Sequence, residues 1–539
     1  MISFFGDPES KVFALETNDK LDNFSIEKLN WVLNAPFLKE QIIKNNFIGP
    51  KSTMISPWST NAVEIINNMG IESLIRIEEF ICIKDDDTFD IMIQEKYKSL
   101  GPDIFKNYKT PDKQILIHDI NEYNKNEGLA LDQNEVDYLN DLSKKLNRKL
   151  TDSEVYGFSQ VNSEHCRHKI FNGRFIIDNK EKEKSLFDLI KLTSKKNKNS
   201  IVSAYSDNVA FIKGPKISLF YPEKGVTSSY YTKKNIDSII SLKAETHNFP
   251  TTVEPYNGAA TGSGGEIRDR LAGGIGSIPL IGTAVYMTPY SRLNKENLWE
   301  DKFKGREWKY QTPSEILIKA SNGASDFGNC FGQPLICGSL LTFEHSEKDH
   351  RLGYDKVIML AGGVGFGEAK QSHKKIPQKG DIIVMLGGDN YRIGMGGASV
   401  SSTDTGNYDN SIELNAVQRS NPEMQKRVTN TIRALFESEE NPIISIHDHG
   451  AGGHLNCFSE LVESTGGEIY IDKLPLGDPS LSYKEIIGNE SQERIGIIIK
   501  ESDYEIVEKI ANRERSPIYI VGKVTNDKKF RVLDREQNI

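Results

Sequence analysis

The sequence predicts a multidomain protein of mixed α+β and α/β class, and two observations support this prediction. First, a chain of 539 residues is too long for one hydrophobic core, and its 37% of hydrophobic residues can fill several cores. Second, the spacing of the apolar residues changes along the chain. Apolar runs alternate with helical patches at first, helical spacing follows, and strands bounded by glycine turns come last. We therefore expect consecutive domains of different architecture.

The order of these patterns places the expected domains. Apolar runs such as 74–80 alternate with helical patches in the first segment, which indicates a small α+β domain. Helical spacing then takes over, and Thr151 with Glu154 has the pattern of a capping box that opens a further helix. After a charged, proline-containing stretch, the run 381–388 is typical of a buried strand. The expected domains are 1–120, a helical linker at 121–180, 181–370 and 371–539.

The composition argues against several classes of protein. The formal charge of −9 is small for this length and disfavours nucleic acid or a membrane surface as the main partner. No stretch approaches the ~20 apolar residues of a membrane span. Acidic residues near Met1 are atypical of a signal peptide, so we expect a cytoplasmic protein. Five scattered cysteines without CxxC spacing predict reduced thiols rather than disulfides or a zinc ribbon.

The segment 243–250, together with 258–269, carries the strongest chemical signal. A lysine, two carboxylates, a histidine and an arginine lie around a run of glycines. This set of side chains can hold a nucleoside triphosphate with Mg²⁺ and move a proton beside it. We therefore predict an ATP site with Mg²⁺ in this part of the chain.

The glycine run 258–265 is interpreted as a flexible loop. It is not a Walker loop, because no Gly-Lys-Ser/Thr follows it, and it lacks a dinucleotide-binding fingerprint. Small side chains would still let backbone N–H groups approach phosphate oxygens, and Arg268 could clamp an oxyanion with two hydrogen bonds. We expect this run to contact phosphate.

Two groups of histidines raise a zinc interpretation that we disfavour. His165 and His168 lie three residues apart, but no cluster of cysteines or carboxylates completes a zinc site. His447 and His449 flank Asp448, and strand alternation would send both histidines to one side and Asp448 to the other. Asp448, at a strand end before a glycine turn, is the better metal ligand, and carboxylates favour Mg²⁺.

Taken together, these motifs resemble those of phosphoribosylformylglycinamidine synthase, an ATP- and glutamine-dependent ligase of purine biosynthesis. The resemblance covers nearly the whole chain. The matching segments are 47–50, 56–64, 163–166, 243–248, 258–269, 319–328, 448–453 and 488–494. The resemblance implies a small N-terminal α+β domain, a helical linker, and a domain pair like that of aminoimidazole ribonucleotide synthetases. That pair has a half-barrel N-domain and an α/β C-domain.

The resemblance also implies roles for single residues. His165 and His247 match active-site histidines, with His247 as the proton acceptor, and Glu245, Asp269 and Asp448 match Mg²⁺ ligands. The implied ATP-binding positions are His168, Lys243, Gly258, Ala259, Ala260, Thr261, Gly262, Ser263, Gly264, Gly265, Glu266, Ile267, Arg268 and Asp269. The implied positions for formylglycinamide ribonucleotide are Thr246, His247, Asn248, Phe249, Arg268, Gln418, Glu490, Ser491 and Gln492.

The chemistry of the family fits these residues. An amide oxygen is a poor leaving group, so the family phosphorylates it with ATP to an iminophosphate, which ammonia then displaces. Mg²⁺ and Lys243 would offset the charge of the triphosphate, and His247 would remove a proton as nitrogen adds.

The length of the chain predicts a partner. The long form of the family carries a second synthetase domain pair and a glutaminase, whereas this chain ends at Ile539, about where the first pair ends. We expect those parts as a separate chain or further domains, whether this chain is a split protein, a truncation or a fragment. We also expect an open half-barrel edge in 200–370 that pairs with the second copy. No cysteine has the context of a glutaminase nucleophile.

Two other interpretations stay open. The chain could be a catalytically silent structural half, or a different small-molecule kinase of the same superfamily, such as a selenophosphate or thiamine-phosphate enzyme. Turnover with ATP and ammonia after addition of the missing half would separate the first alternative from a synthetase. The motifs at 163–166 and 490–494 disfavour the second alternative.

Overall fold

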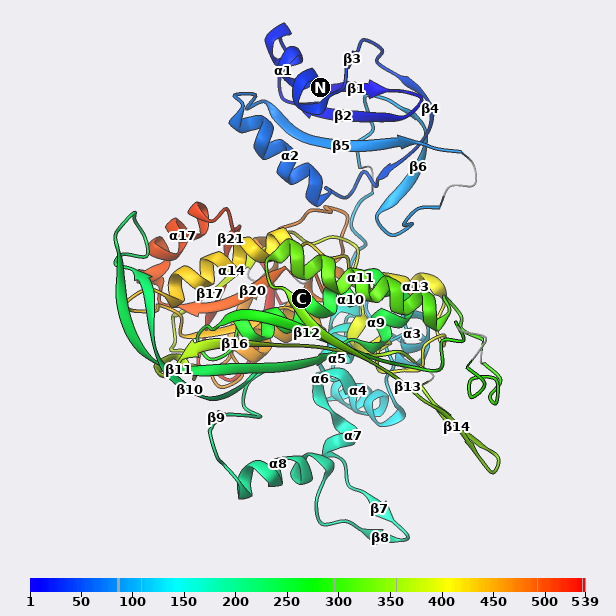
Figure 1. The fold of residues 1–539 in the computed structure, drawn as a ribbon, viewed down its shortest axis with the longest axis vertical. Coiled ribbons are helices and arrows are strands. Elements are labelled where there is room, and N and C mark those ends of the chain that lie inside the picture. The colour runs from blue at the N-terminus through cyan, green and yellow to red at the C-terminus, as the bar shows by residue number, and fades with distance from the viewer. Residues whose placement is uncertain are drawn as a thin grey trace. The chain divides into compact units, whose positions relative to one another are not determined.

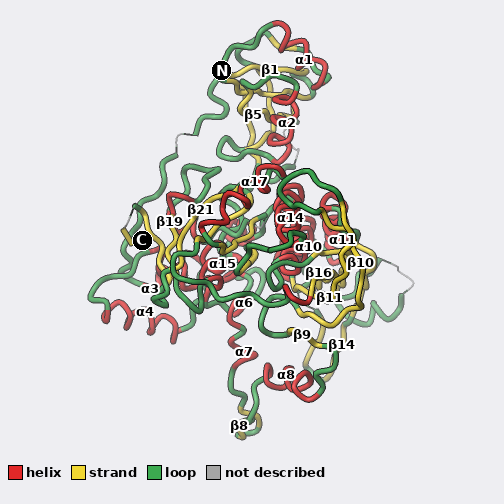
Figure 2. The backbone as a smooth tube through the Cα atoms, turned by 90° about the vertical axis from the view of Figure 1, so that its left-hand side faces the viewer, coloured by secondary structure: helices red, strands yellow, loops and turns green. Residues whose placement is uncertain are grey.

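The computed structural model contains two compact units. The first consists of residues 1–113 with 476–482, and the second of residues 114–475 with 483–539. Figures 1 and 2 show the helices and strands of each unit. The structure describes residues 1–84, 88–107, 109–293, 297–305, 307–354, 356–491, 493–535 and 537–538. Among these residues, no helix is long and apolar enough to cross a membrane.

The first unit is a six-stranded sheet with two helices (Figure 1). Its strands, in the order β3-β1-β2-β5-β4-β6, are β1 (Ile2–Asp7), β2 (Lys11–Thr17), β3 (Phe37–Leu38), β4 (Ile43–Pro50), β5 (Leu74–Cys82) and β6 (Gln94–Leu100). Helices α1 (Asn23–Leu33) and α2 (Pro57–Asn68) begin after the side-chain caps Asp22 and Ser56. Both helices pack on one face, where Leu29 and Ile66 meet Phe5. The small α+β domain is therefore confirmed.

The second unit begins with the expected helices. They are α3 (Ile120–Glu127), α4 (Gln133–Lys145), α5 (Asp152–Val161), α6 (Glu164–Arg167), α7 (Lys169–Asn172) and α8 (Leu186–Lys196), with the short hairpin β7 (Ile176–Ile177) and β8 (Lys180–Glu181) before α8. Thr151 and Glu154 form the predicted capping box at the start of α5. Most of α5 is buried, whereas α8 has no buried residue.

A six-stranded sheet follows, with helices on one face (Figure 1). Its strands, in the order β13-β12-β16-β11-β10-β9, are β9 (Ile201–Ser203), β10 (Ala210–Pro222), β11 (Tyr231–Thr246), β12 (Ile278–Thr288), β13 (Leu335–Thr342) and β16 (Ile358–Glu368). Helices α9 (Asn248–Val253), α10 (Pro255–Leu271) and α11 (Pro313–Phe331) accompany it, and β14 (Glu344–Glu347) pairs with β15 (His350–Gly353). Strands β12 and β13 run parallel, with α11 as their crossover.

A seven-stranded sheet forms the last part of the second unit. Its order is β18-β20-β17-β21-β19-β22-β23, with β17 (Ile382–Gly387), β18 (Ser445–Asp448), β19 (Gly467–Tyr470), β20 (Arg494–Ile499), β21 (Ile518–Val524), β22 (Phe530–Asp534) and β23 (Gln537–Asn538). Its helices are α12 (Gly397–Val400), α13 (Asn410–Ala416), α14 (Pro422–Phe436), α15 (Gly453–Leu461), α16 (Tyr483–Ile487) and α17 (Tyr504–Arg513). Short 3₁₀ turns lie at Ala369–Gln371, Ile471–Lys473 and Glu501–Asp503. Leu271 of α10 packs into the same core as Ile432 and Ile497, so α10 joins the two sheets.

The glycine run 258–265 is not a loop, which corrects the sequence interpretation. It lies inside α10, and nearly every residue of this helix is buried. The glycines allow close packing: a Cβ on Gly258 would lie 2.3 Å from the carbonyl carbon of Pro250, and one on Gly262 would lie 2.9 Å from the Cβ of His247. Because N–H groups inside a helix bond to carbonyls one turn earlier, the run cannot cradle phosphate as a loop would. Its small side chains instead bring α10 against His247.

Candidate active site

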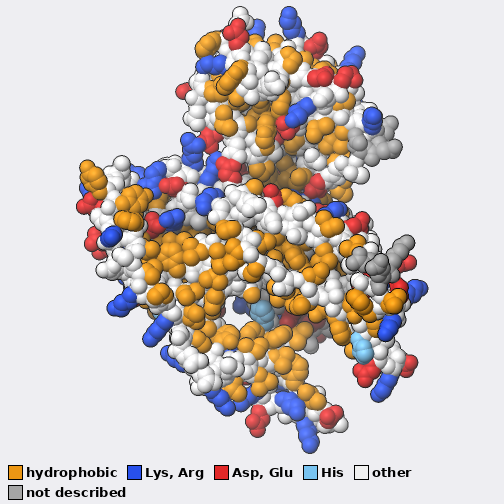
Figure 3. Space-filling model, viewed as in Figure 1, with side chains coloured by type: hydrophobic (Ala, Val, Ile, Leu, Met, Phe, Trp, Pro, Cys, Tyr) orange, Lys and Arg blue, Asp and Glu red, His pale blue; other side chains and the backbone are white. Residues whose placement is uncertain are grey.

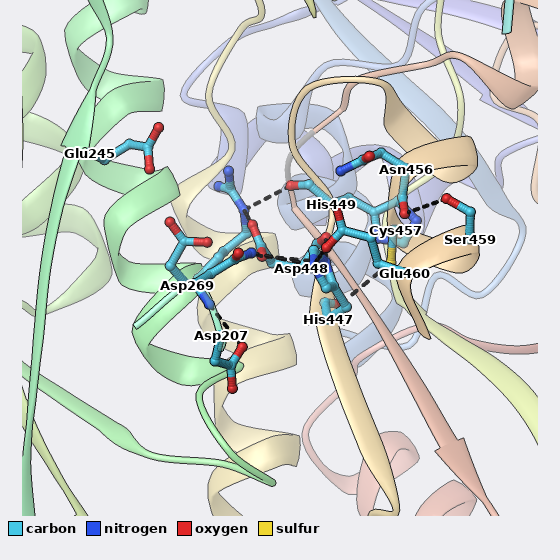
Figure 4. A network of polar contacts seen from close by, with 12 residues as sticks. Asp207, Glu245, Asp269, His447, Asp448, His449, Asn456, Cys457, Ser459 and Glu460 are labelled. Atoms are coloured by element: carbon cyan, nitrogen blue, oxygen red, sulfur yellow. Dashed lines mark hydrogen bonds and ion pairs between the residues drawn. The ribbon is translucent and has the colours of Figure 1, made fainter. Parts of the chain in front are cut away.

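Charged side chains from β11, α10 and β18 meet beside α10 (Figure 4). The ammonium of Lys243 lies 2.8 Å from Asp269 Oδ2 and 3.0 Å from Glu245 Oε2. Lys243 and Glu245 are two residues apart on β11, so both side chains face α10. Burial alone would lower the pKa of Lys243, but the Asp269 and Glu245 carboxylates raise it well above its ordinary value. Lys243 therefore stays charged and holds both carboxylates.

Asp269 and Asp448 form a buried pair of carboxyl groups. Each side chain is 8% exposed. Burial and the neighbouring Asp448 raise the pKa of Asp269 to about 6, although Lys243 opposes this shift. Asn208, in the loop before β10, donates a hydrogen bond of 3.4 Å to Asp448 Oδ1. Two adjacent buried carboxyl groups favour a shared proton or a cation bound between them.

The three carboxylates expected to bind Mg²⁺ are linked, but they do not form one cluster of ligands. Among the described residues, no group of three or more His, Cys, Asp or Glu side chains is arranged to hold a metal ion. The reason is that Lys243 bridges Glu245 and Asp269, which leaves Asp269 and Asp448 as the adjacent pair. Figure 4 shows Asp269 facing Asp448, with Glu245 farther away. The oxygen donors of this buried pair fit Mg²⁺.

His247 directly follows β11 and presents one ring nitrogen for proton transfer. Its Nδ1 donates a hydrogen bond to the Gly258 carbonyl of α10. In the neutral ring, this leaves the lone pair on Nε2. Burial lowers the pKa of His247 to about 4, against the opposing effects of Glu245 and the Gly258 carbonyl. The ring is therefore neutral at pH 7, and its Nε2 can accept a proton.

His165 belongs to the same site. It lies in α6, is exposed, and its backbone N–H is 3.4 Å from Ser402 Oγ. Partial desolvation of the ring among protein atoms lowers the pKa of His165, whereas the nearby Glu245 raises it. The Glu245 carboxylate opposes the lowering of the pKa of both His165 and His247. The two predicted histidines therefore lie near the same carboxylate.

The lowered pKa of His247 predicts a loss of stability in acid. An unfolded histidine titrates near ~6.5, and the folded ring titrates at about 4, so the folded chain resists protonation between these values. The stability present above the unfolded pKa is lost as the pH falls through the folded pKa. The advantage of wild type over His247→Gln in free energy of unfolding should therefore shrink by about 2–3 kcal/mol on acidification to the folded pKa. Urea unfolding of wild type and His247→Gln at several pH values measures this change. A difference in free energy of unfolding that does not vary with pH would contradict the lowered pKa of His247.

Comparisons with known proteins show which families and structures the chain resembles. Residues 10–98 match the formylglycinamide ribonucleotide amidotransferase N-terminal model, and residues 120–169 match the linker domain model of the same enzyme. Residues 378–535 match the C-terminal domain of AIR synthase related proteins. The chain is 36% identical over 544 residues to phosphoribosylformylglycinamidine synthase of Dictyostelium discoideum, a match that covers 96% of this chain and 40% of that relative.

The chain matches the N-terminal part of long-form phosphoribosylformylglycinamidine synthase. It spans 40% of the length of the curated relative. A solved structure of Thermotoga maritima PurL complexed with FGAR is similar in fold, with a TM-score of 0.52 and 25% identity over 75% of this chain and 55% of that one. The expected succession of a small domain, a linker and a synthetase-like pair is thus confirmed.

The sequence predicts that Arg268 clamps an oxyanion, but in the structure its side chain is buried and bonded to other residues of the chain. The side chain is 2% exposed. Its Nε donates to the His449 carbonyl over 3.2 Å and its Nη1 to Gln425 Oε1 over 2.9 Å. Asp448 Oδ2 lies 3.9 Å from Nε. Arg268 therefore connects α10 to α14 and to the residue that follows β18. The sequence alone does not show that this side chain is buried.

Gln418 and Glu490 lie together in the C-terminal part of the second unit. Glu490 is 3% exposed and accepts hydrogen bonds of 3.0 Å from the N–H groups of Ala398 and Gly452. Burial raises its pKa to about 7, although these N–H groups and Gln418 oppose the shift. The Oε1 atom of Gln418 is buried and has no hydrogen-bond partner among the described residues. This acceptor is therefore available to a ligand.

Of three further expected substrate residues, Thr246 ends β11 and Asn248 and Phe249 begin α9, and only Thr246 is exposed. Asn248 uses its Oδ1 to accept a hydrogen bond of 3.0 Å from the backbone N–H of Met359. Phe249 is 2% exposed and packs in a core cluster with Val253. The Phe249 ring is therefore part of this core, and a contact of this residue with substrate stays a prediction.

The remaining predicted residues are spread more widely. His168 is exposed, adopts a left-handed backbone conformation, and its ring centroid lies 5.6 Å from that of Phe187. Ser491 donates its backbone N–H to Asn489 Oδ1 over 3.2 Å. Gln492 lies outside the residues that the structure describes.

The side chains of the two histidines that flank Asp448 contact residues of α15. His447 contacts Glu460 of α15 over 2.5 Å, and His449 contacts His454 of the same helix over 2.9 Å. Asp448 faces α10 instead, so the predicted alternation is confirmed (Figure 4). Burial would lower the pKa of His447, but its hydrogen bonds to Cys457 and Glu460 raise it overall. Sequence reasoning missed Glu460, because no motif marks this position.

Proposed function

We propose that this chain is the first synthetase half of a phosphoribosylformylglycinamidine synthase. Its reaction would convert formylglycinamide ribonucleotide to the amidine with ATP, Mg²⁺ and ammonia that a glutaminase supplies. The similarity of the fold to a PurL complexed with FGAR supports the substrate. The observation that carries the proposal is the meeting of Lys243, Asp269 and Asp448 with a neutral His247 at one place.

The charged cluster suits a bound triphosphate and its metal ion. Asp269 and Asp448 would hold Mg²⁺, with Glu245 nearby, and Mg²⁺ when bound neutralises the negative charge of the phosphates. Lys243 stays protonated because of its two carboxylate partners. It is placed to shift from these carboxylates to phosphate oxygens, and the carboxylates would then be free for the metal.

His247 would act on the amide end of the substrate. Its Nδ1–H is fixed by the Gly258 carbonyl, so only Nε2 can receive the proton that leaves ammonia as nitrogen adds to the phosphorylated amide. Phosphate then departs with the former amide oxygen, and the amidine remains. The buried acceptor on Gln418 and the exposed Thr246 would hold the ribonucleotide.

Binding measurements test this function directly. Formylglycinamide ribonucleotide and Mg²⁺–ATP should each raise the thermal midpoint of the second unit. Asp448→Asn should abolish the dependence on Mg²⁺ and leave the ribonucleotide effect, whereas Gln418→Ala should do the reverse. A chain that binds ATP but not the ribonucleotide would favour another small-molecule kinase. Binding of neither ligand would favour a silent structural half.

The second sheet offers a surface for the missing synthetase half. Helices cover one face, and the other face carries exposed Leu242 and Leu341, which are 36% and 50% exposed; Leu341 pairs with Met287 of β12. Alternate residues of β16, such as Leu360, are half-buried there. Figure 3 shows hydrophobic side chains spread across this region. Because the chain spans 40% of its curated relative, we assign this face to the second domain pair.

An apolar sheet face without its partner should make the isolated chain self-associate. We expect sedimentation at tens of micromolar (about the range of specific weak interfaces) to show dimers or larger species. The double variant Leu242→Glu with Leu341→Glu should be monomeric, because charge on the face opposes burial. Ile376→Glu is a matched control, since Ile376 is 71% exposed but lies elsewhere. A monomeric wild type would contradict this assignment.

A further inference from the structure

Helix α5 of the linker is embedded in the C-terminal part of the second unit. Seven of its ten residues are buried, and it packs against α12, α15 and α16. The contact with α15 is close, because a Cβ on Gly157 would lie 2.8 Å from Leu455 Cδ1. These helices adjoin the backbone segments whose N–H groups hold Glu490. A mere tether between domains would not need such burial.

Gln160 of α5 binds the first turn of α12. Its Nε2 donates to Ser399 Oγ over 3.1 Å, and its Oε1 lies 3.4 Å from the Ser399 backbone nitrogen. The same Ser399 hydroxyl lies 3.0 Å from the Gly396 carbonyl. One side-chain amide of the linker thus holds both the side chain and the backbone at the start of α12.

Tyr156 of α5 fills the space between the two segments beside Glu490. A Cβ on Gly488 would lie 2.4 Å from Tyr156 Cε1, and one on Gly396 would lie 3.6 Å from the Tyr156 hydroxyl. The hydroxyl is buried and has no hydrogen-bond partner among the residues that the structure describes. Burial, with a smaller effect of Glu490, raises the pKa of Tyr156 well above its ordinary value. The ring therefore packs where only glycine leaves enough room.

We propose that Gln160 and Tyr156 are positioning residues for the ribonucleotide site. Through Ser399 and the glycine turn 394–397, α5 would set the place of Glu490 and Gln418. The link is direct: Glu490 accepts the Ala398 N–H, and a Cβ on Gly394 would lie 2.6 Å from Gln418 Cγ. This inference rests on the proposed function, because only then do Glu490 and Gln418 meet a substrate.

Hydrogen exchange measures the positioning without any ligand. Gln160→Leu should speed amide exchange in peptides that cover 394–402 by about tenfold, the effect of losing one to two buried hydrogen bonds. Asn124→Leu is the matched control, because Asn124 makes two 3.0 Å hydrogen bonds to Leu131 within the linker and none to α12. Unchanged exchange at 394–402 in Gln160→Leu would overturn the inference. Equal acceleration throughout the second unit would do the same.

Compensation tests the packing of Tyr156. Gly488→Ala places a methyl group against the ring and should speed exchange at 394–402. The smaller side chain of the double variant Gly488→Ala with Tyr156→Leu should make room and restore slow exchange. If the double variant exchanges as fast as Gly488→Ala alone, Tyr156 has no positioning role.

Calorimetric titration with formylglycinamide ribonucleotide separates this inference from the proposed function. Gln160→Leu should raise the dissociation constant about tenfold, in step with exchange at the turn, whereas Asn124→Leu should leave it unchanged. If wild type does not bind the ribonucleotide, the proposed function fails and the exchange results alone decide the positioning. If exchange rises but affinity stays the same, the turn does not set the ribonucleotide site and the inference fails.

Discussion

Replacement of His247 by alanine is expected to lower ammonia-dependent turnover by roughly 10²–10⁴-fold, the usual share of a general base. The chain should first be combined with its second synthetase half. Burial lowers the pKa of His247 to about 4, and its Nδ1–H is fixed, so at neutral pH the ring is neutral and Nε2 carries the lone pair that can accept a proton. The alanine variant should keep its affinity for Mg²⁺–ATP, because Lys243 and Asp269 contact each other without His247.

The control for this variant is a histidine far from the cluster. His350 lies exposed on β15, at the tip of the β14–β15 hairpin, and His350→Ala should turn over like wild type. If His247→Ala keeps wild-type turnover across a pH range of about 6–9, a range that spans histidine titration, then His247 only neighbours the charged cluster.

Arg494→Leu is expected to destabilise the second unit by about 3–5 kcal/mol, the cost of breaking a buried polar network from one side. Arg494 is fully buried, with 0% exposure. It donates to Asn390 Oδ1 over 2.6 Å and to Asn489 Oδ1, and it contacts His454 Nε2 at 2.5 Å. Burial lowers its pKa to about 10, so it stays charged at pH 7. Its removal would leave these acceptors unpaired in the protein interior.

Urea unfolding followed by a probe in the second unit measures this loss. Arg433→Leu is the matched control, because the Arg433 side chain is 56% exposed and pairs with Glu437 one turn away. That variant should change the free energy of unfolding by less than ~0.5 kcal/mol. A similar small effect of Arg494→Leu would show that the network does not hold β20 to the turn before α15.

The features that the sequence predicts well are those with local causes. Thr151 and Glu154 announce a helix start because both partners of the capping box lie within four residues. Asp448 is found because a buried strand followed by glycines places a side chain at a strand end, where ligands gather. The small α+β domain follows from short alternating runs for the same reason.

The features that the sequence predicts poorly depend on distant packing. The glycines of 258–265 suggest a loop by composition, yet α10 needs them to pack closely against neighbouring segments: a Cβ on Gly264 would lie 2.8 Å from Phe327 Cζ of α11. Arg268 looks like a phosphate clamp, but its partner Gln425 comes from α14. Asn208 lies in no motif and reaches Asp448 only in the folded unit. Such partners become visible only when the tertiary structure is known.

We propose that the cluster around Lys243, Asp269 and Asp448 directs phosphorylation of the amide of formylglycinamide ribonucleotide by ATP. Ammonia then displaces the phosphate. The most direct measurement combines the chain with the second synthetase half, ATP, Mg²⁺, ammonia and the ribonucleotide, and follows ADP and the amidine together. Wild type should form ADP and the amidine in equal amounts. Asp448→Asn should form neither product. ADP release that is independent of the ribonucleotide, or amidine formation that survives Asp448→Asn, would contradict this proposal.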